Sequence, residues 1–101
     1  MSLQSKDKRR SLYEFEYPVT KILDIHKDCL VGNHYHKKRD ETFILLRGRG
    51  ISLIDDVTKD MGLHEEFAVR RGKLHSFYLF KGSLLLEFAT KKYDPKDDYK
   101  V

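Results

Sequence analysis

The sequence contains few of the residues that cross-link a small protein or interrupt its secondary structure. Its 101 residues include one cysteine, two prolines and no tryptophan. A single cysteine excludes an internal disulfide and fits a reducing cytoplasm. No apolar run approaches the roughly 18 residues of a membrane span, and the polar N-terminus does not read as a signal peptide. We therefore expect a cytoplasmic protein without membrane contact, in which Cys29 is a buried, inert thiol.

Charge is abundant but unevenly placed. Lys and Arg number 20 against 16 Asp and Glu, a formal charge of +4. Residues 6–10 hold four basic side chains and one acidic one, so most of the surplus lies at the N-terminus. A protein that binds nucleic acid normally spreads a basic face over its folded body. We therefore expect no nucleic-acid partner, and we assign residues 1–11 to a basic tail that is disordered or an added leader.

Short apolar stretches, separated by glycine and charge, predict an all-β domain. The length suits one domain, which we place at residues 12–90, followed by a charged C-terminal tail at 91–101. No stretch predicts a helix, and the polar residues 55–62 read as a loop. Such spacing is typical of a β-sandwich or barrel. The eight predicted strands cover residues 13–17, 20–26, 30–36, 41–47, 51–54, 63–69, 74–80 and 84–90.

The stretch from His34 to Gly48 carries the clearest chemical pattern. His34 and His36 are two residues apart, so on a strand they face the same side. The gap at residues 37–40 is polar and has the length of a hairpin loop. Glu41 would then return on a neighbouring antiparallel strand to the face that carries the two histidines. This face is predicted to comprise Leu30, Gly32, His34 and His36.

A fourth ligand is predicted at His75, which follows a turn containing Gly72. Three imidazoles and one carboxylate suit one divalent transition metal, namely Fe, Mn, Ni, Cu or Zn. Four protein ligands leave open positions on an octahedral ion, as in catalytic rather than structural sites. The alternative interpretation is that these four side chains are ordinary polar strand residues in a pocket without a metal.

At these residues the chain resembles the cupin superfamily. The first cupin motif, H-x-H, four residues, E, six residues, G, is met by His34, His36, Glu41 and Gly48. Of the second motif, Gly72 and His75 match, while Arg70 replaces its proline and Leu79 its asparagine. The resemblance covers about residues 12–90 and implies a double-stranded β-helix, the jelly-roll barrel.

The resemblance implies a metal-binding protein with an apolar pocket. It implies a metal-dependent enzyme of the isomerase, epimerase or dioxygenase type, acting on a small polar metabolite such as a carbohydrate or a keto or hydroxy acid. The alternative is a non-catalytic module that binds or senses a ligand. The pocket is predicted to be lined by Phe43, Leu45, Phe77 and Leu79, with Arg47 and Arg70 as possible anion-binding residues.

A homodimer is also expected, because cupins often pair through their N-terminal strands. The alternating Tyr13, Phe15 and Tyr17 would form the seam. Simple packing of these aromatic side chains in the core is the alternative interpretation.

Overall fold

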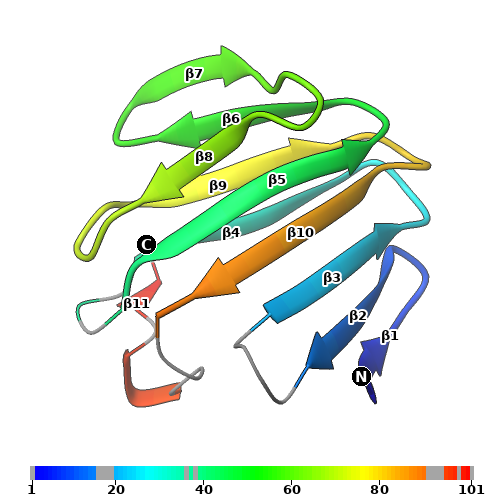
Figure 1. Cartoon of the computed structure of the whole chain (residues 1–101), viewed down its shortest axis with the longest axis horizontal. Helices are drawn as coiled ribbons and strands as arrows, with labels where there is room; N and C mark the ends of the chain where they lie inside the picture. The colour runs from blue at the N-terminus through cyan, green and yellow to red at the C-terminus, as the bar shows by residue number, and fades with distance from the viewer. Residues whose placement is uncertain are drawn as a thin grey trace.

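Two antiparallel β-sheets face each other in the computed structural model, shown in Figure 1. It describes residues 2–15, 20–35, 37, 39–90, 95–97 and 99–100, and of residues 2–6, 14, 15, 33–35, 95 and 100 only the backbone. The only helical segment in these ranges is the 3-10 turn η1, Pro95–Asp97. Within the described residues, no helix is long and apolar enough to span a membrane.

The larger sheet has six strands in the order β1-β2-β3-β10-β5-β8. Their bounds are β1 Ser2–Lys6, β2 Arg10–Phe15, β3 Thr20–Ile25, β10 Leu84–Ala89, β5 Glu41–Arg47 and β8 Glu66–Val69. The smaller sheet has the order β11-β4-β9-β6-β7. Its bounds are β11 Tyr99–Lys100, β4 Cys29–Tyr35, β9 His75–Leu79, β6 Gly50–Ile54 and β7 Val57–Asp60. Neighbours distant in sequence, such as β5 and β10, show that the sheets are built from non-local pairs.

Strand alternation places the core between the two sheets. Along β5, Glu41, Phe43 and Leu45 are buried while the residues between them are partly exposed, as expected when one face of a strand is packed. The core consists of Leu23, Ile25, Cys29, Phe43, Leu45, Met61, Phe67, Val69, Phe77, Leu79 and Leu85. The all-β expectation is therefore confirmed, and Cys29 is buried as predicted.

Three segments differ from the expectation. Ser2–Lys6, which we had placed in an N-terminal tail, forms β1 and pairs with β2. Tyr99–Lys100, from the C-terminal tail, pairs with the end of β4. Val57–Asp60, predicted as loop, forms β7 because Asp55 and Asp56 adopt φ of 50° and 66° and close a two-residue hairpin. All four residues of β7 are exposed, so its sequence lacks the alternation that reveals a half-buried strand.

A β-bulge changes which residues of β4 face the core. Leu30 was expected to face inward, but it is 53% exposed, while Val31 packs against the core. The pairing of β4 with β9 then shifts between Gly32 and His34, so that Asn33 is an extra residue. Gly32 has φ +96°, and a Cβ there would lie 2.9 Å from the His75 carbonyl oxygen. The bulge therefore needs glycine and resets the strand just before His34.

Candidate metal centre

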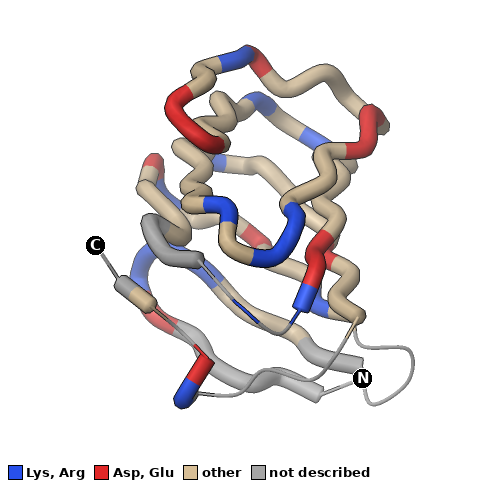
Figure 2. Tube along the Cα trace, turned by 90° about the vertical axis from the view of Figure 1, so that its left-hand side faces the viewer, with Lys and Arg blue, Asp and Glu red and all other residues tan. Residues whose placement is uncertain are grey.

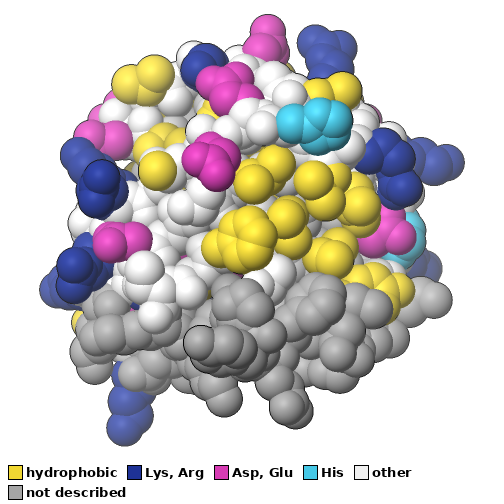
Figure 3. Space-filling model, in the orientation of Figure 1, with side chains coloured by type: hydrophobic (Ala, Val, Ile, Leu, Met, Phe, Trp, Pro, Cys, Tyr) yellow, Lys and Arg dark blue, Asp and Glu magenta, His cyan; other side chains and the backbone are white. Residues whose placement is uncertain are grey.

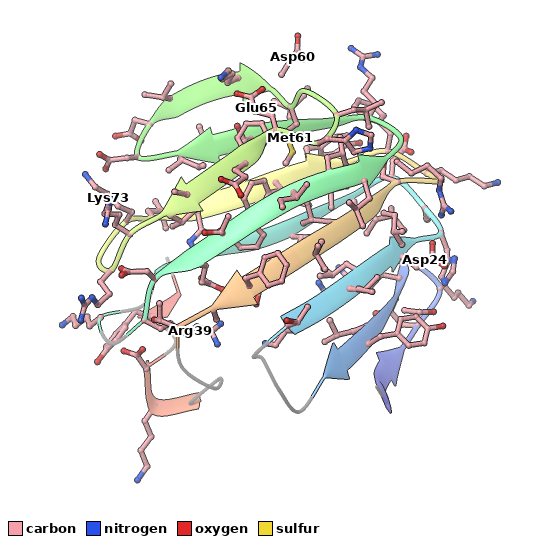
Figure 4. The ribbon with its side chains drawn as sticks, in the orientation of Figure 1. Asp24, Arg39, Asp60, Met61, Glu65 and Lys73 are labelled. Atoms are coloured by element: carbon pink, nitrogen blue, oxygen red, sulfur yellow. The ribbon has the colours of Figure 1, made fainter. Side chains whose placement is uncertain are left out.

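The interior is polar at one end of the sandwich, where β5 and β9 begin and β10 ends. Glu41 and His75 face inward there, and their side chains are each 2% exposed. Arg39, which precedes β5, is 4% exposed and lies beside them; Figure 4 labels it at this end. Figure 2 looks onto the same end and shows Lys and Arg segments around it. Alternation along strands that are otherwise apolar thus carries ionisable groups into the protein interior.

Glu41 and His75 are placed as ligands of one ion would be. Glu41 Oε1 lies 3.4 Å from His75 Nε2. Two ligand atoms that are each about 2.1 Å from one ion stand about 3.0–3.4 Å apart at angles of 90–109°. The other ring nitrogen of His75, Nδ1, lies 3.4 Å from the Lys73 carbonyl oxygen, which leaves Nε2 directed at Glu41. Nitrogen and oxygen donors of this kind fit a borderline divalent metal.

The other two predicted ligands can be placed only in part. His34 lies in β4 directly opposite His75 in β9, as the register of the two strands shows. Its side chain, and the whole of His36, lie outside the described residues. Among the side chains that the structure describes, no three or more of His, Cys, Asp and Glu are grouped so as to hold a metal. The four-ligand centre therefore remains a prediction, to which the structure contributes the Glu41–His75 pair and the position of residue 34.

Three ionisable side chains at this end did not emerge from the sequence. Arg39 Nη2 donates to Glu41 Oε2 at 3.0 Å. Lys21 Nζ lies 3.8 Å from Glu87 Oε2, and both side chains are 12% exposed. Alternation along β10 could have predicted that Glu87 faces inward, because it is two residues from the fully buried Leu85. Arg39 has no such signal, since it stands in a polar run that reads as a solvated loop.

The environment of Glu41 disfavours its charged form. Burial, followed by the nearby Glu87 carboxyl, raises the pKa of Glu41 to about 8, although the charges of Arg39 and Lys21 act in the opposite direction. A carboxyl removed from water keeps its proton unless a cation compensates its charge. A divalent ion at this position would supply such compensation.

The residues predicted to line the pocket divide into two pairs. Phe43 and Phe77 have ring centroids 5.6 and 6.1 Å from that of His75, so they form an apolar wall beside it. Leu45 and Leu79 are fully buried and lie two residues further along their strands, deeper in the core. The aromatic pair therefore borders the polar end, while the leucine pair belongs to the packed interior.

The two arginines predicted to bind anions are both exposed and lie at different ends of the molecule, Arg70 next to Val69, which pairs with Glu41. Arg47 is exposed at the opposite end of β5, where it donates to the Gly82 carbonyl oxygen and to Asp24; Figure 4 labels Asp24 at that end. We expected Arg47 to face inward because it follows Glu41 at an even offset. The β5–β10 register shifts next to it, opposite Leu84 and Leu85, so counting residues no longer gives its direction. Arg70 is exposed beside the turn before β9.

Neither a protein-family profile nor a curated protein sequence matches this chain. Solved structures do match. The capsular polysaccharide assembling protein CapF from Staphylococcus aureus has TM-score 0.82 and 19% identity, over 100% of this chain and 32% of CapF. KdgF from Halomonas sp. has TM-score 0.82 and 10% identity, over 95% of this chain and 91% of KdgF. A sugar phosphate isomerase from a cupin superfamily of Silicibacter pomeroyi has TM-score 0.71 and 17% identity, over 82% of this chain and 60% of the isomerase.

These similarities establish the class of fold. The chain has the double-sheet jelly-roll fold of the cupin superfamily, as the spacing of His34, His36, Glu41 and Gly48 led us to expect. It spans about a third of CapF but nearly the whole of KdgF. At such low identities the likeness concerns the fold, and function has to be argued from the site itself.

Proposed function

We propose that this chain is a metal-binding cupin protein in which His34, His36, Glu41 and His75 hold one divalent transition metal. The observation that carries the proposal is the inward-facing Glu41–His75 pair, whose Oε1 and Nε2 atoms are 3.4 Å apart. The register that sets His34 opposite His75 supports a further imidazole at the same place. When bound, the metal would act as a Lewis acid toward an oxygen of the ligand.

We further propose an enzyme of the isomerase or epimerase type, with a small polar metabolite as its substrate. The likeness to a sugar phosphate isomerase supports carbohydrate chemistry over a dioxygenase reaction. The same likeness favours a substrate that carries an acid group, as a sugar phosphate does.

Metal analysis tests the first part of the proposal. We expect His34→Ala and His75→Ala, purified without an affinity tag, to retain less than about a tenth of the wild-type metal content. His64→Asn is the matched control, because His64 is an exposed histidine with φ +64°, a conformation that asparagine tolerates. Equal metal content in the wild type and all three variants would defeat the site assignment.

A substrate screen tests the second part. The metal-loaded protein should be offered sugar phosphates, uronic acids and hydroxy and keto acids, with neutral sugars as controls. Conversion of an acidic sugar is the expected result. Tight binding of one of these compounds without turnover would favour the non-catalytic binding module instead.

We also propose that two copies pair through the outer face of the six-stranded sheet. The registers align Tyr13, Ile22, Leu86 and Ile44 side by side across β2, β3, β10 and β5, and Phe88 adds a large exposed side chain. Figure 3 shows the resulting apolar patch. Such a patch marks an interaction surface. A straight row across four strands can stack on its own copy after a two-fold rotation, which favours a homodimer.

This interface differs from the predicted seam of Tyr13, Phe15 and Tyr17. The Phe15 side chain and the whole of Tyr17 lie outside the described residues, and β1 pairs along the edge of β2. We expect Leu86→Glu to shift the mass measured by light scattering to that of a monomer. Leu53→Glu, on the exposed face of the smaller sheet, is the control. A wild-type monomer, or a dimer unaffected by Leu86→Glu, would contradict this interface.

A further inference from the structure

Arg39 is unusual for a residue in a predicted loop. It lies between the positions of two predicted ligands, His36 and Glu41, in a run that the sequence marks as solvated. Its side chain is nevertheless only 4% exposed. Arginine is almost never buried to this extent without a charged partner. The partner here includes Glu41, whose Oε2 accepts a hydrogen bond from Arg39 Nη2 at 3.0 Å.

The two oxygens of Glu41 face different groups. Oε2 is bonded to Arg39, while Oε1 lies 3.4 Å from His75 Nε2. A carboxylate that binds a metal through one oxygen is commonly held in orientation by a hydrogen bond to the other. A charge-assisted bond from a guanidinium is about twice as strong as a neutral one and is more directional. Arg39 thus fixes the carboxylate plane so that Oε1 is the atom presented at the polar end.

Asp40 keeps Arg39 in this place. The Asp40 carboxylate accepts a hydrogen bond from the Arg71 backbone N–H at 2.8 Å. The Asp40 backbone N–H donates to the Thr90 hydroxyl, and the Thr90 N–H donates to the Asp40 carbonyl oxygen, both at 3.0 Å. These contacts join three segments distant in sequence and point Asp40 outward. Since neighbouring side chains of an extended segment alternate, Arg39 points inward.

We propose that Arg39 is a positioning residue of the metal centre, holding Glu41 Oε2 so that Oε1 faces the ion together with His75 Nε2. The inference rests on the proposed metal binding and extends it to a residue that is not itself a ligand. It predicts that a change at Arg39 alters both the affinity for the metal and the ligand field, although every ligand remains in place.

Titration with Co²⁺ tests this, because the ion reports both its affinity and, through its visible absorption, its ligand geometry. Arg39→Gln should bind Co²⁺ about 10–100-fold more weakly than the wild type, with a changed absorption spectrum. Arg39→Lys keeps the positive charge and a hydrogen-bond donor, so its affinity for Co²⁺ should lie between those of the wild type and Arg39→Gln. Arg49→Gln, an exposed arginine at the other end of the molecule, should bind like the wild type.

Two further measurements separate the possible outcomes. Asp40→Ala leaves Arg39 intact but loosens its segment, so a weakening of a few fold is expected even if Arg39→Gln does not fold. Thermal unfolding of each metal-free variant reports purely structural damage.

A lower Tm with unchanged Co²⁺ affinity and spectrum would overturn the inference. Tighter binding by Arg39→Gln would also overturn it, because Arg39 would then compete with the metal for Glu41. A wild type that binds no Co²⁺ refutes the proposed function as well, whereas a binding wild type with unaffected variants refutes this inference alone.

Discussion

The two ends of the interior are built from the same strands but differ in chemistry. At one end Ile25, Leu45, Leu79 and Leu85 are at most 1% exposed and fill the space between the sheets. At the other, continuations of these strands and their flanking residues bring in Lys21, Arg39, Glu41, His75 and Glu87. The strands position the apolar and the ionisable side chains equally well. The two ends therefore differ in how the burial of their side chains affects the stability of the fold.

Burial of the apolar end contributes stability, whereas burial of the polar end opposes it. A fully buried aliphatic side chain contributes about 1.5–3 kcal/mol. Removing an ion from water costs several kcal/mol, which its partner only partly offsets. If stability alone determined the sequence, apolar residues such as leucine would fill both ends of the interior. The ionisable groups kept inside at that end are consistent with the metal binding proposed above.

The largest effect is expected at the apolar end. Leu79→Ala should lower the free energy of unfolding by about 2–5 kcal/mol, because it leaves a cavity in a packed core. Denaturation by urea measures the change, and the metal content of the folded protein should stay at the wild-type level. Loss of metal from well-folded Leu79→Ala would show that the two ends are not separate in function.

A smaller effect is expected for the Lys21–Glu87 pair. Lys21→Met should destabilise the protein by about 1–3 kcal/mol, since it leaves Glu87 without the closest cation described beside it. In the double variant Lys21→Met/Glu87→Leu, apolar packing should restore most of this loss. Chemical denaturation of the single and double variants gives the comparison. A double variant less stable than Lys21→Met would mean that Glu87 stabilises the fold through partners other than Lys21.

The stability of the metal-free protein should depend on pH through Glu41. Burial, with Glu87, raises its pKa from 4.5 to about 8. Below pH 4.5 the carboxyl is protonated in both the folded and the unfolded state, so the free energy of unfolding does not change with pH through this group. As the pH rises from 4.5 to 8 the unfolded state releases this proton more readily, so stability declines and then levels off. Subtracting the profile of Glu41→Gln should isolate this decline, and parallel profiles would contradict it.

The last prediction concerns a reaction rate, that of Cys29 at the apolar end. Burial raises the pKa of its thiol, and only the thiolate reacts rapidly with disulfide reagents. We expect the native protein to react with such a reagent at least about 100-fold more slowly than the protein unfolded in urea, as local opening is rare in a packed core. Equal rates would show that this end is open to solvent.

The sequence predicts the apolar end better than the polar one. Alternation places Phe43, Leu45 and Glu41 on one face of a strand, and the structure agrees. The burial of Arg39 could not be foreseen, because Asp40 holds its segment through Arg71 and Thr90, which are 31 and 50 residues away. The bulge at Asn33 is equally hidden, since it exists only in the register of β4 with β9.

Anomalous diffraction at the absorption edge of the bound metal tests the central claim most directly. Crystals of the metal-loaded protein are predicted to show one strong anomalous peak within bonding distance of both Glu41 Oε1 and His75 Nε2. A peak only at surface residues, or no peak in protein shown to contain metal, would contradict a metal centre at the polar end.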